Sequence, residues 1–456
     1  MSSQETRHFK RVLTRMDTIA LAFGAMIGWS WVLLTGSWIT SAGTIGAMLG
    51  FLFGGGVILC VALTYAELAA AMPSAGGEHV YSFRALGARP AFICSWAMVF
   101  GYVSVSAFEA VALPYAVTQF FPKLETGFLW TIAGWDVTAG FVALGVAASL
   151  ILTWINVRGV RPAALAQKTV TLAILIIGLV FLTGVGFNGD ASNLEPWFSD
   201  SYRGIYTVLI IVPIMFVGFD VIPQAAEEIN LPVKTIGRLV VISVVAAILW
   251  YVAMIVGVGF SLDADARATS ALTTADASGQ VWNSEAARVL LIVGGIAGIL
   301  TSWNAFMIGA SRLIYAMAEA GQLPGFLADI HPRFGTPYKA IILLGFINCL
   351  SPWFGRPILV WLINAGSFGV IIAYVFVAAS FVVLRIREPQ MARPYRLRFG
   401  KLIGTAALVL SLAMTVLFLP GSPAALAWPQ EWGICLIWVL LGMCFWGAAR
   451  KSLNTQ

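Results

Sequence analysis

The stretches GAMIGWSWVLLTG, from Gly24 to Gly36, and VPIMFVGFDVIPQAAEE, from Val212 to Glu228, decide the fold of this chain. Each lies within a long apolar run, and each contains residues that weaken a helix. The first has three glycines in thirteen residues, and the second contains Pro213, Gly218 and Pro223. Unpaired backbone at membrane depth survives only beside a polar cavity or a ligand. We therefore predict that both apolar helices are interrupted at these points.

The composition places both stretches in a lipid bilayer. Of 456 residues, 59% are hydrophobic and 11% are charged, whereas soluble domains carry about 25% charged residues. So few charges could not cover the surface of a soluble protein of this size. The composition excludes a soluble enzyme, a nucleic-acid binder and a disordered protein, and it makes the lipid bilayer the expected partner.

Apolar runs long enough to cross a bilayer recur along the whole chain. They predict an all-α membrane protein with about twelve spans. The predicted spans are 18–40, 43–71, 91–121, 137–157, 164–186, 204–229, 237–260, 288–318, 339–354, 358–384, 402–419 and 430–449. The two interrupted spans, 1 and 6, open two successive sets of five, and breaks at matching positions indicate a transporter site. The alternative is a pair of kinked helices that pack through small residues.

The basic residues predict the orientation. With a cytoplasmic N-terminus, 22 of the 27 lysines and arginines fall in inner segments, and Lys123, Arg203, Arg267, Arg288 and Arg356 fall outside. This positive-inside bias favours an even number of spans, with both termini in the cytoplasm. The net charge of +6 is then a topology signal, with no nucleic-acid meaning.

Two acids lie deep in the apolar runs, where an ionisable group indicates function by default. Glu109 lies in the middle of span 3 and shares a helical face with Ser106, and Asp220 lies in the suspected break of span 6. Either carboxylate is a candidate for binding an ammonium group or a proton. The alternatives are a hydrogen-bonded packing residue at Glu109 and a helix cap at Asp220. Glu67, Glu227 and Glu228 lie near inner membrane ends, where structural ion pairs are expected.

Metal and cofactor chemistry has no support in the sequence. His8, His79 and His331 lie on a terminus or on loops without ligand spacing, and the five cysteines occur singly within apolar runs. We expect no metal site, no cofactor and no enzyme activity.

Several separate motifs resemble those of the amino acid–polyamine–organocation (APC) superfamily of permeases. They are YAEL (65–68), PSAGGEHVYSFRALG (73–87), FVGFDVIPQAAEEINLP (216–232), SRLIYAMAEAGQLPGFLADIHPRFGTPYKA (311–340) and RPYRLRFG (393–400). In the second motif, His79 stands where the family often has a tyrosine. The motifs occur in family order from the first to the last third of the chain.

The resemblance implies two inverted five-span repeats plus two trailing spans, the LeuT-like architecture. The corresponding parts are a tail at 1–17, repeats at 18–200 and 201–392, and 393–456 with the last two spans and a second tail. Substrate would lie between the breaks of spans 1 and 6, and Phe216 would close over it. The implied substrate-binding residues are Ala25, Met26, Ile27, Gly28, Trp29, Ser30, Ser106, Glu109, Phe216, Val217, Gly218, Phe219, Asp220 and Asn304, with Asn364 or Ser367 as looser candidates.

One departure from the family pattern affects the expected substrate. Where the family commonly has Ile-Gly-Ser-Gly-Ile-Phe, this chain has two indoles, Trp29 and Trp31, beside the amides that usually bind a carboxylate. We expect an inner-membrane permease for an amino acid or a related small amine, driven by a proton or by exchange. Glu109 and Asp220 are the proton-coupling candidates. The alternatives are a carrier of amines or polyamines that lack a carboxylate and, in another class, a membrane receptor or sensor.

Overall fold

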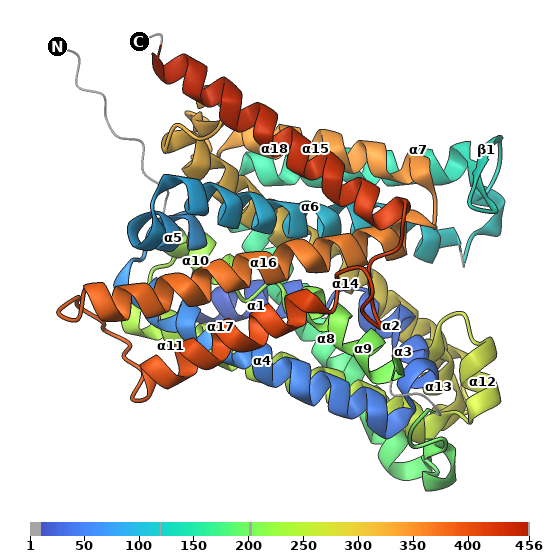
Figure 1. Ribbon diagram of the computed structural model, residues 1–456. Helices are drawn as coiled ribbons and strands as arrows, with labels where there is room; N and C mark the ends of the chain where they lie inside the picture. Colours follow the sequence, from blue (N-terminus) through green and yellow to red (C-terminus); the bar gives the residue numbers. More distant parts are fainter. Residues whose placement is uncertain (1–10, 119, 200–202, 455–456) are drawn as a thin grey trace.

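The structure, a computed structural model, describes residues 11–118, 120–199 and 203–454. Long helices run side by side and form one bundle (Figure 1). The helices are α1 (Arg15–Met26), α2 (Ser30–Leu33), α3 (Thr35–Ala42), α4 (Thr44–Ala71), α5 (Glu78–Leu86), α6 (Ala88–Thr118), α7 (Ala139–Arg158), α8 (Val160–Asn188), α9 (Arg203–Phe216), α10 (Val221–Gln224), α11 (Val233–Ser261), α12 (Ala264–Thr269), α13 (Thr273–Trp282), α14 (Glu285–Glu319), α15 (Tyr338–Leu350), α16 (Ile358–Arg387), α17 (Gly400–Val416) and α18 (Gln430–Asn454). Two strands, β1 (Phe128–Ile132) and β2 (Trp135–Thr138), and the 3-10 turns η1 (Pro122–Leu124), η2 (Ala191–Leu194), η3 (Ala226–Glu228), η4 (Gly325–Ala328) and η5 (Ser351–Phe354) complete the described elements.

Both predicted helix breaks are present. The first span divides between α1 and α2, because α1 ends at Met26 and α2 begins at Ser30. The sixth divides between α9 and α10, with the backbone irregular from residue 217 to residue 220. Gly218 has a φ of 133°, a value that a residue with a side chain rarely adopts.

Ten helical segments in the described residues are long and apolar enough to cross a membrane, which confirms an all-helical membrane protein. Two shorter apolar helices, at Tyr338–Phe354 and Gly400–Val416, occupy the places of predicted spans 9 and 11. The total of twelve spans and the inverted repeat stay predictions. The predicted boundary between the repeats, at residues 200 and 201, and most of the N-terminal tail lie outside the described residues.

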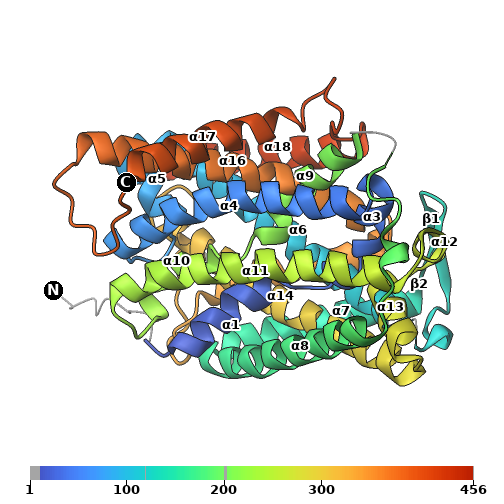
Figure 2. The ribbon, with the colours of Figure 1, turned by 90° about the horizontal axis from the view of Figure 1, so that it is seen from below.

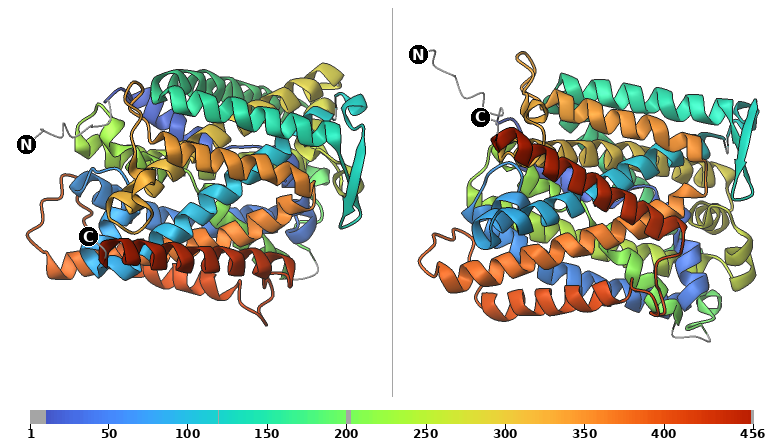
Figure 3. Two further views of the ribbon diagram at one scale, coloured as in Figure 1. Left: turned by 90° about the horizontal axis from the view of Figure 1, so that it is seen from above. Right: turned by 45° about the horizontal axis from the view of Figure 1, so that its top comes forward.

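The two ends of the bundle differ in their connections. One end carries the start of α1, the end of α18, and α5; we call it the terminal end. The opposite end carries the β1–β2 hairpin, α12 and α13; we call it the hairpin end (Figures 1 and 2). Helices α17 and α18 lie on one flank of the bundle, and α8 lies on the opposite flank (Figures 2 and 3).

The connections contain more structure than the sequence predicted. The all-α expectation missed the hairpin, whose antiparallel strands turn at Ala133 (φ 48°) and Gly134 (φ 78°). A two-residue turn with positive φ at both positions matches the twist of the paired strands. The long polar connection at 262–286 likewise folds into α12 and α13 rather than an extended loop.

Buried ion pairs hold the terminal end together. Glu67 in α4 binds Arg385 at the end of α16 and lies 3.0 Å from Arg393. Glu228 in η3 binds Arg312 in α14 at 2.8 Å. The expected ion pairs are therefore present for both acids. Glu227 accepts the Ala75 backbone N–H at 3.1 Å and has no ion pair among the described residues, so for this residue the ion-pair expectation stays a prediction.

Candidate functional site

The break in the first span lies deep in the bundle, where polar side chains of other helices satisfy its carbonyl groups. The Tyr251 hydroxyl on α11 donates to the Met26 carbonyl oxygen at 2.6 Å and lies 3.2 Å from the Ser30 hydroxyl. Thr301 on α14 donates to the Gly24 carbonyl oxygen at 3.2 Å. Since orphaned carbonyls are costly in the membrane, these hydroxyls stabilise the interruption. Tyr251 thus bridges the two sides of the break.

Glu109 reaches this break from α6. Its side chain is 2% exposed, and it accepts hydrogen bonds from the Ser302 hydroxyl and the Trp29 backbone N–H. A Cβ added to Gly28 would lie 2.5 Å from Oε1 of Glu109, so the carboxylate lies directly against the glycine. The other oxygen, Oε2, has no hydrogen-bond partner among the described residues. A buried acid with one open acceptor can take a cationic or protonated group.

A small enclosed cavity of about 30 Å³ lies beside this carboxylate. Five predicted site residues line it: Ala25, Met26, Gly28, Ser30 and Glu109. Seven further lining residues were not predicted: Val105, Phe108, Ile214, Met215, Ser302, Phe306 and Ile363. A cavity of this size holds about one water molecule. The site is therefore closed around a space that is smaller than any amino acid.

The break in the sixth span packs against the first. A Cβ at Gly218 would lie 2.7 Å from the Ala25 side chain and 3.1 Å from the Met26 nitrogen. Asp220 accepts the Gly218 N–H at 2.9 Å through Oδ1 and the Tyr374 hydroxyl at 3.1 Å through Oδ2. The Asp220 side chain makes no capping hydrogen bond to α10, because its amide partner, Gly218, lies before that helix, within the break. Through this contact, Asp220 stabilises the non-helical backbone of the segment to which it belongs.

Several predicted site residues do not line the cavity in this conformation: Ile27, Trp29, Ser106, Phe216, Val217, Gly218, Phe219, Asp220 and Asn304. Their role in substrate binding stays a prediction. Phe216 packs against Phe51 and Tyr251. Trp29 contacts α14 at Gly295, where an added Cβ would lie 2.2 Å from the indole ring. Both rings therefore contribute to packing here.

The polar candidates outside the cavity have partners of their own. Ser106 accepts from Asn348, and Asn304 lies in a chain of amides between Asn156 and Gln167. The looser candidates are also engaged. The Asn364 amide donates to Glu431 on α18 at 2.6 Å, and the Ser367 hydroxyl donates to the Ile210 carbonyl oxygen at 2.7 Å. These are helix-to-helix contacts, which sequence spacing alone does not distinguish from substrate contacts.

A second cavity of about 390 Å³ lies at the hairpin end. Arg267 and Arg356 line it together with the ends of α2, α3 and α16. Two of its lining residues, Phe108 and Ile363, also line the small cavity beside Glu109. This apolar pair therefore separates the enclosed site from the larger cavity. We call it the Phe108–Ile363 partition.

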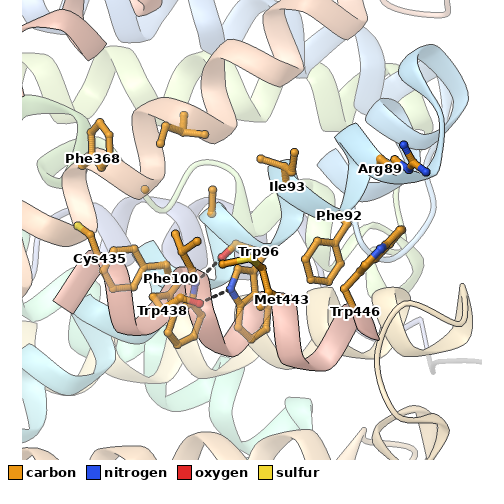
Figure 4. Close-up of a pocket in the computed structure, with 15 residues that line it drawn as sticks. Arg89, Phe92, Ile93, Trp96, Phe100, Phe368, Cys435, Trp438, Met443 and Trp446 are labelled. Carbon is orange, nitrogen blue, oxygen red and sulfur yellow. Dashed lines mark hydrogen bonds between the residues drawn. The ribbon is translucent and has the colours of Figure 1, made fainter. Parts of the chain in front are cut away.

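A third cavity, of about 490 Å³, is an apolar groove among α6, α16 and α18 (Figure 4). Trp96 and Trp438 stack there with ring centroids 4.5 Å apart, and each indole N–H donates to the other residue's carbonyl oxygen at 2.9 Å. Arg89 is the charged side chain at its edge. The groove lies on an outer flank, away from both breaks, so it is separate from the candidate site.

The described residues contain no cluster of three histidine, cysteine, aspartate or glutamate side chains that could hold a metal. His8 lies outside the described part of the chain. His79 is buried with Nδ1 2.9 Å from the Ser95 hydroxyl, and burial lowers its pKa to about 4. It is a neutral packing residue at physiological pH.

Comparison with known proteins agrees with this architecture. Residues 13–443 match the family model described as amino acid permease. The chain belongs to the amino acid permease family. It is 26% identical to the branched-chain amino acid permease BcaP of Bacillus subtilis, over 86% of this chain and 84% of that protein. It is 25% identical to the methylthioribose transporter of the same organism, over 97% and 94%. A third relative, the B. subtilis aspartate-proton symporter, is 26% identical over 88% of this chain and 78% of its own length.

Family membership confirms the APC resemblance and identifies the chain as a multi-pass membrane transporter. The named relatives act on chemically different molecules: branched-chain amino acids, a methylthio sugar and aspartate. The family therefore does not select one substrate.

Proposed function

We propose that this protein carries an amino acid or a related small amine across the inner membrane by alternating access. The observation that supports the proposal is Glu109: a buried carboxylate against Gly28, in a closed cavity where the two broken spans meet. An acid in that position is suited to binding the ammonium group of a substrate, because both charges are then removed from water as a pair.

The cavities support the alternating-access part of the proposal. The enclosed cavity of about 30 Å³ cannot hold a substrate without movement. The nearby cavity of about 390 Å³ at the hairpin end is separated from it by the Phe108–Ile363 partition. Rotation of these two apolar side chains, with a small movement of α2 and α16, would join the cavities. The buried ion pairs of Glu67 and Glu228 keep the terminal end closed in this conformation.

The terminal end faces the cytoplasm in this proposal. The predicted inner segments contain most of the basic residues, which are retained on the cytoplasmic side of a membrane. The larger cavity would then open toward the outside. In the conformation described here, the cytoplasmic end would be closed, and the Phe108–Ile363 partition would close the site on the outer side. Transport would be driven by a proton, with Glu109 or Asp220 as carrier, or by exchange for a second substrate.

One contact favours a second candidate, a carrier of amines without a carboxylate. The resemblance implies that amides in the break of span 1 hold the substrate carboxylate. Here the Trp29 N–H already donates to Glu109, so a substrate carboxylate would meet a like charge at this amide. A decarboxylated amine would avoid that repulsion.

Uptake by purified protein in proteoliposomes tests both candidates. The panel comprises leucine, aspartate, lysine, the amines that correspond to them, and methylthioribose. We expect uptake of at least one amine-bearing compound, and Glu109→Gln should lower its kcat/KM at least about thirtyfold because the ammonium loses its charged partner. Glu431→Gln is the matched control, since Glu431 is a buried acid bonded to an amide on the outer flank. Unchanged uptake in the Glu109 variant would overturn the assignment. A parent amino acid that outcompetes its amine would reject the second candidate.

A further inference from the structure

The apolar groove among α6, α16 and α18 has no part in the proposed transport, although it is the largest of the three cavities, at about 490 Å³. We call it the flank groove. Several apolar side chains that line it are open to their surroundings: Ile93 is 49% exposed, Val439 is 51% exposed and Met443 is 58% exposed. No described part of the chain covers these side chains. In a membrane protein, such a groove faces the lipid.

The flank groove is as long as one leaflet of a bilayer is thick. Its lining on α6 covers residues 89–100, and its lining on α18 covers residues 435–446. Each stretch rises by about 16 Å, and half of a bilayer's hydrocarbon core is about 15 Å thick. The two walls meet through aromatic rings, because Phe92 on α6 lies against Trp446 on α18 with ring centroids 4.8 Å apart. One extended acyl chain of a single leaflet matches this length.

One end of the flank groove lies at the level of the lipid headgroups. Helix α6 has 31 residues, so it is about 46 Å long, whereas a bilayer with its headgroups is about 40–45 Å thick. Arg89 is the second residue of α6 and therefore lies at headgroup level at the terminal end. Trp446 lies at the same end of the groove (Figure 4), and tryptophan is enriched at membrane interfaces. The groove thus begins among headgroups and ends near the middle of the bilayer.

The polar groups of the flank groove select the kind of molecule that fits it. Arg89 is the only charged side chain among the described residues that line it. It is exposed and has no hydrogen bond or ion pair among the described residues, whereas Arg84 and Arg385 at the same end bind glutamates. The indole N–H groups of Trp96 and Trp438 donate to each other's carbonyl oxygens. A matching occupant is therefore apolar along its length and anionic at one end.

We propose that the flank groove binds one anionic phospholipid from the leaflet at the terminal end. An acyl chain lies between α6 and α18, and the phosphate lies against the Arg89 guanidinium. In the proposed orientation this leaflet is the cytoplasmic one, whose anionic lipids attract basic residues near the membrane surface. The lipid site stands on the shape and charge of the groove, so it does not depend on which substrate the protein carries.

Lipid binding to the purified full-length protein tests the role of Arg89. Native mass spectrometry follows titrations with dioleoyl phosphatidylglycerol and dioleoyl phosphatidylcholine, which have the same chains and differ in net charge. We expect the first phosphatidylglycerol to bind at least about fivefold more tightly than the first phosphatidylcholine, the factor that one basic residue contributes at an anionic surface. Arg89→Gln should lower this ratio nearly to one. Lys401→Gln is the matched control, because Lys401 is an exposed basic residue at the start of α17 that does not line the groove.

A second pair of variants tests the position of the acyl chain. Ile93→Trp places a large ring in the flank groove and keeps Arg89, so it should abolish the tight first binding of phosphatidylglycerol. Ile93 is half exposed, and the added ring therefore displaces lipid rather than the core. Ile242→Trp is the control, since Ile242 is 44% exposed on α11, outside the groove. Glycerol phosphate, the headgroup without chains, should not displace the bound lipid.

The outcomes separate this site from ordinary lipid contact and from other occupants. Equal affinities of the wild type for the two lipids would overturn the proposal, and so would a ratio that Arg89→Gln leaves unchanged. Displacement of the lipid by glycerol phosphate would indicate a site for free anions and would reject the acyl-chain position. A wild-type dimer that Ile93→Trp dissociates, measured by light scattering, would show that a second copy covers the groove. If the Arg89 variant does not fold, tight phosphatidylglycerol binding that survives in Ile93→Trp still rejects the proposal.

Discussion

Each of the two helix breaks contacts an acidic side chain. The two acids differ in whether they belong to another helix or to the break itself. At the break of span 1 the carboxylate comes from another helix: Glu109 of α6 accepts the Trp29 N–H. At the break of span 6 the carboxylate belongs to the break, where Asp220 accepts the Gly218 N–H. An acid from a neighbouring helix can leave its amide without unfolding the break. An acid within the break cannot leave its amide without changing the backbone of that segment. Its contact is therefore more suited to stabilising the backbone conformation of the break.

The breaks also differ in how they are anchored. The break of span 1 is held by neutral hydroxyls, those of Tyr251 and Thr301. The segment that follows the break of span 6 is held by a buried ion pair between Glu228 and Arg312. Hydroxyl contacts exchange readily with substrate or water, whereas a buried ion pair is costly to separate. In the proposed mechanism, the first break would be the adaptable side of the site and the second the gated side.

The largest expected effect on stability tests the anchoring of the second break. Glu228→Gln removes the negative charge that lies 2.8 Å from the Arg312 guanidinium, which is only 1% exposed. Removing one partner of a buried ion pair costs about 3–5 kcal/mol. We expect a fall of several degrees in the melting temperature of the detergent-solubilised protein, measured by intrinsic fluorescence.

The neighbouring acid provides the control for this prediction. Glu227 accepts a backbone N–H from Ala75, a role that glutamine can also fill, so Glu227→Gln should leave the melting temperature nearly unchanged. Equal melting temperatures for both variants would show that the second break is not anchored by charge.

A smaller effect, on transport rather than stability, tests the first break. In Gly28→Ala the new methyl carbon would lie 2.5 Å from the Glu109 carboxylate and 2.9 Å from the Ser302 hydroxyl. Both are ends of side chains that can move, so the fold survives while the acid is displaced from its position. A misplacement on this scale should lower kcat/KM about tenfold or more.

Gly56→Ala is the matched substitution, because an added Cβ at Gly56 meets no atom within 4 Å. It should leave uptake unchanged. Equal uptake by the two alanine variants would show that transport does not depend on the contact between Glu109 and the first break.

The breaks could be predicted from sequence because their causes are local. Glycines and prolines within apolar runs weaken a helix wherever the chain then folds, and all twelve apolar runs correspond to helices in the structure. The cavity lining was predicted less completely. Ser302 and Ile363 reach it from α14 and α16, and their positions depend on packing between spans far apart in the sequence. Asn304, two residues after Ser302, was a predicted site residue, yet its amide bonds to Asn156 and Gln167.

Glu78 shows the same limit more clearly. Its motif, between predicted spans 2 and 3, was used to recognise the family, and Glu78 was not singled out as a candidate. Burial arises only when α5 folds against α6 and α16 and Gln224 reaches it from α10. No spacing rule connects residues 146 positions apart in the chain. The hairpin at 128–138 was missed for a different reason, because its short alternating strands lie between two much stronger apolar signals.

The smallest expected effect concerns the single hydroxyl that bridges the first break. Tyr251→Phe leaves the Met26 carbonyl oxygen without its 2.6 Å donor and removes the neighbour of the Ser30 hydroxyl. An orphaned buried acceptor costs about 1–3 kcal/mol, so the melting temperature should fall by a few degrees, less than for Glu228→Gln. Tyr81→Phe is the informative contrast, because the buried Tyr81 hydroxyl has no partner among the described residues and its removal should be neutral or stabilising. If the two phenylalanine variants have the same melting temperature, the Tyr251 hydrogen bond does not stabilise the break. In that case the adaptable side of the site must be held by the packing of Trp29 and Trp31 instead.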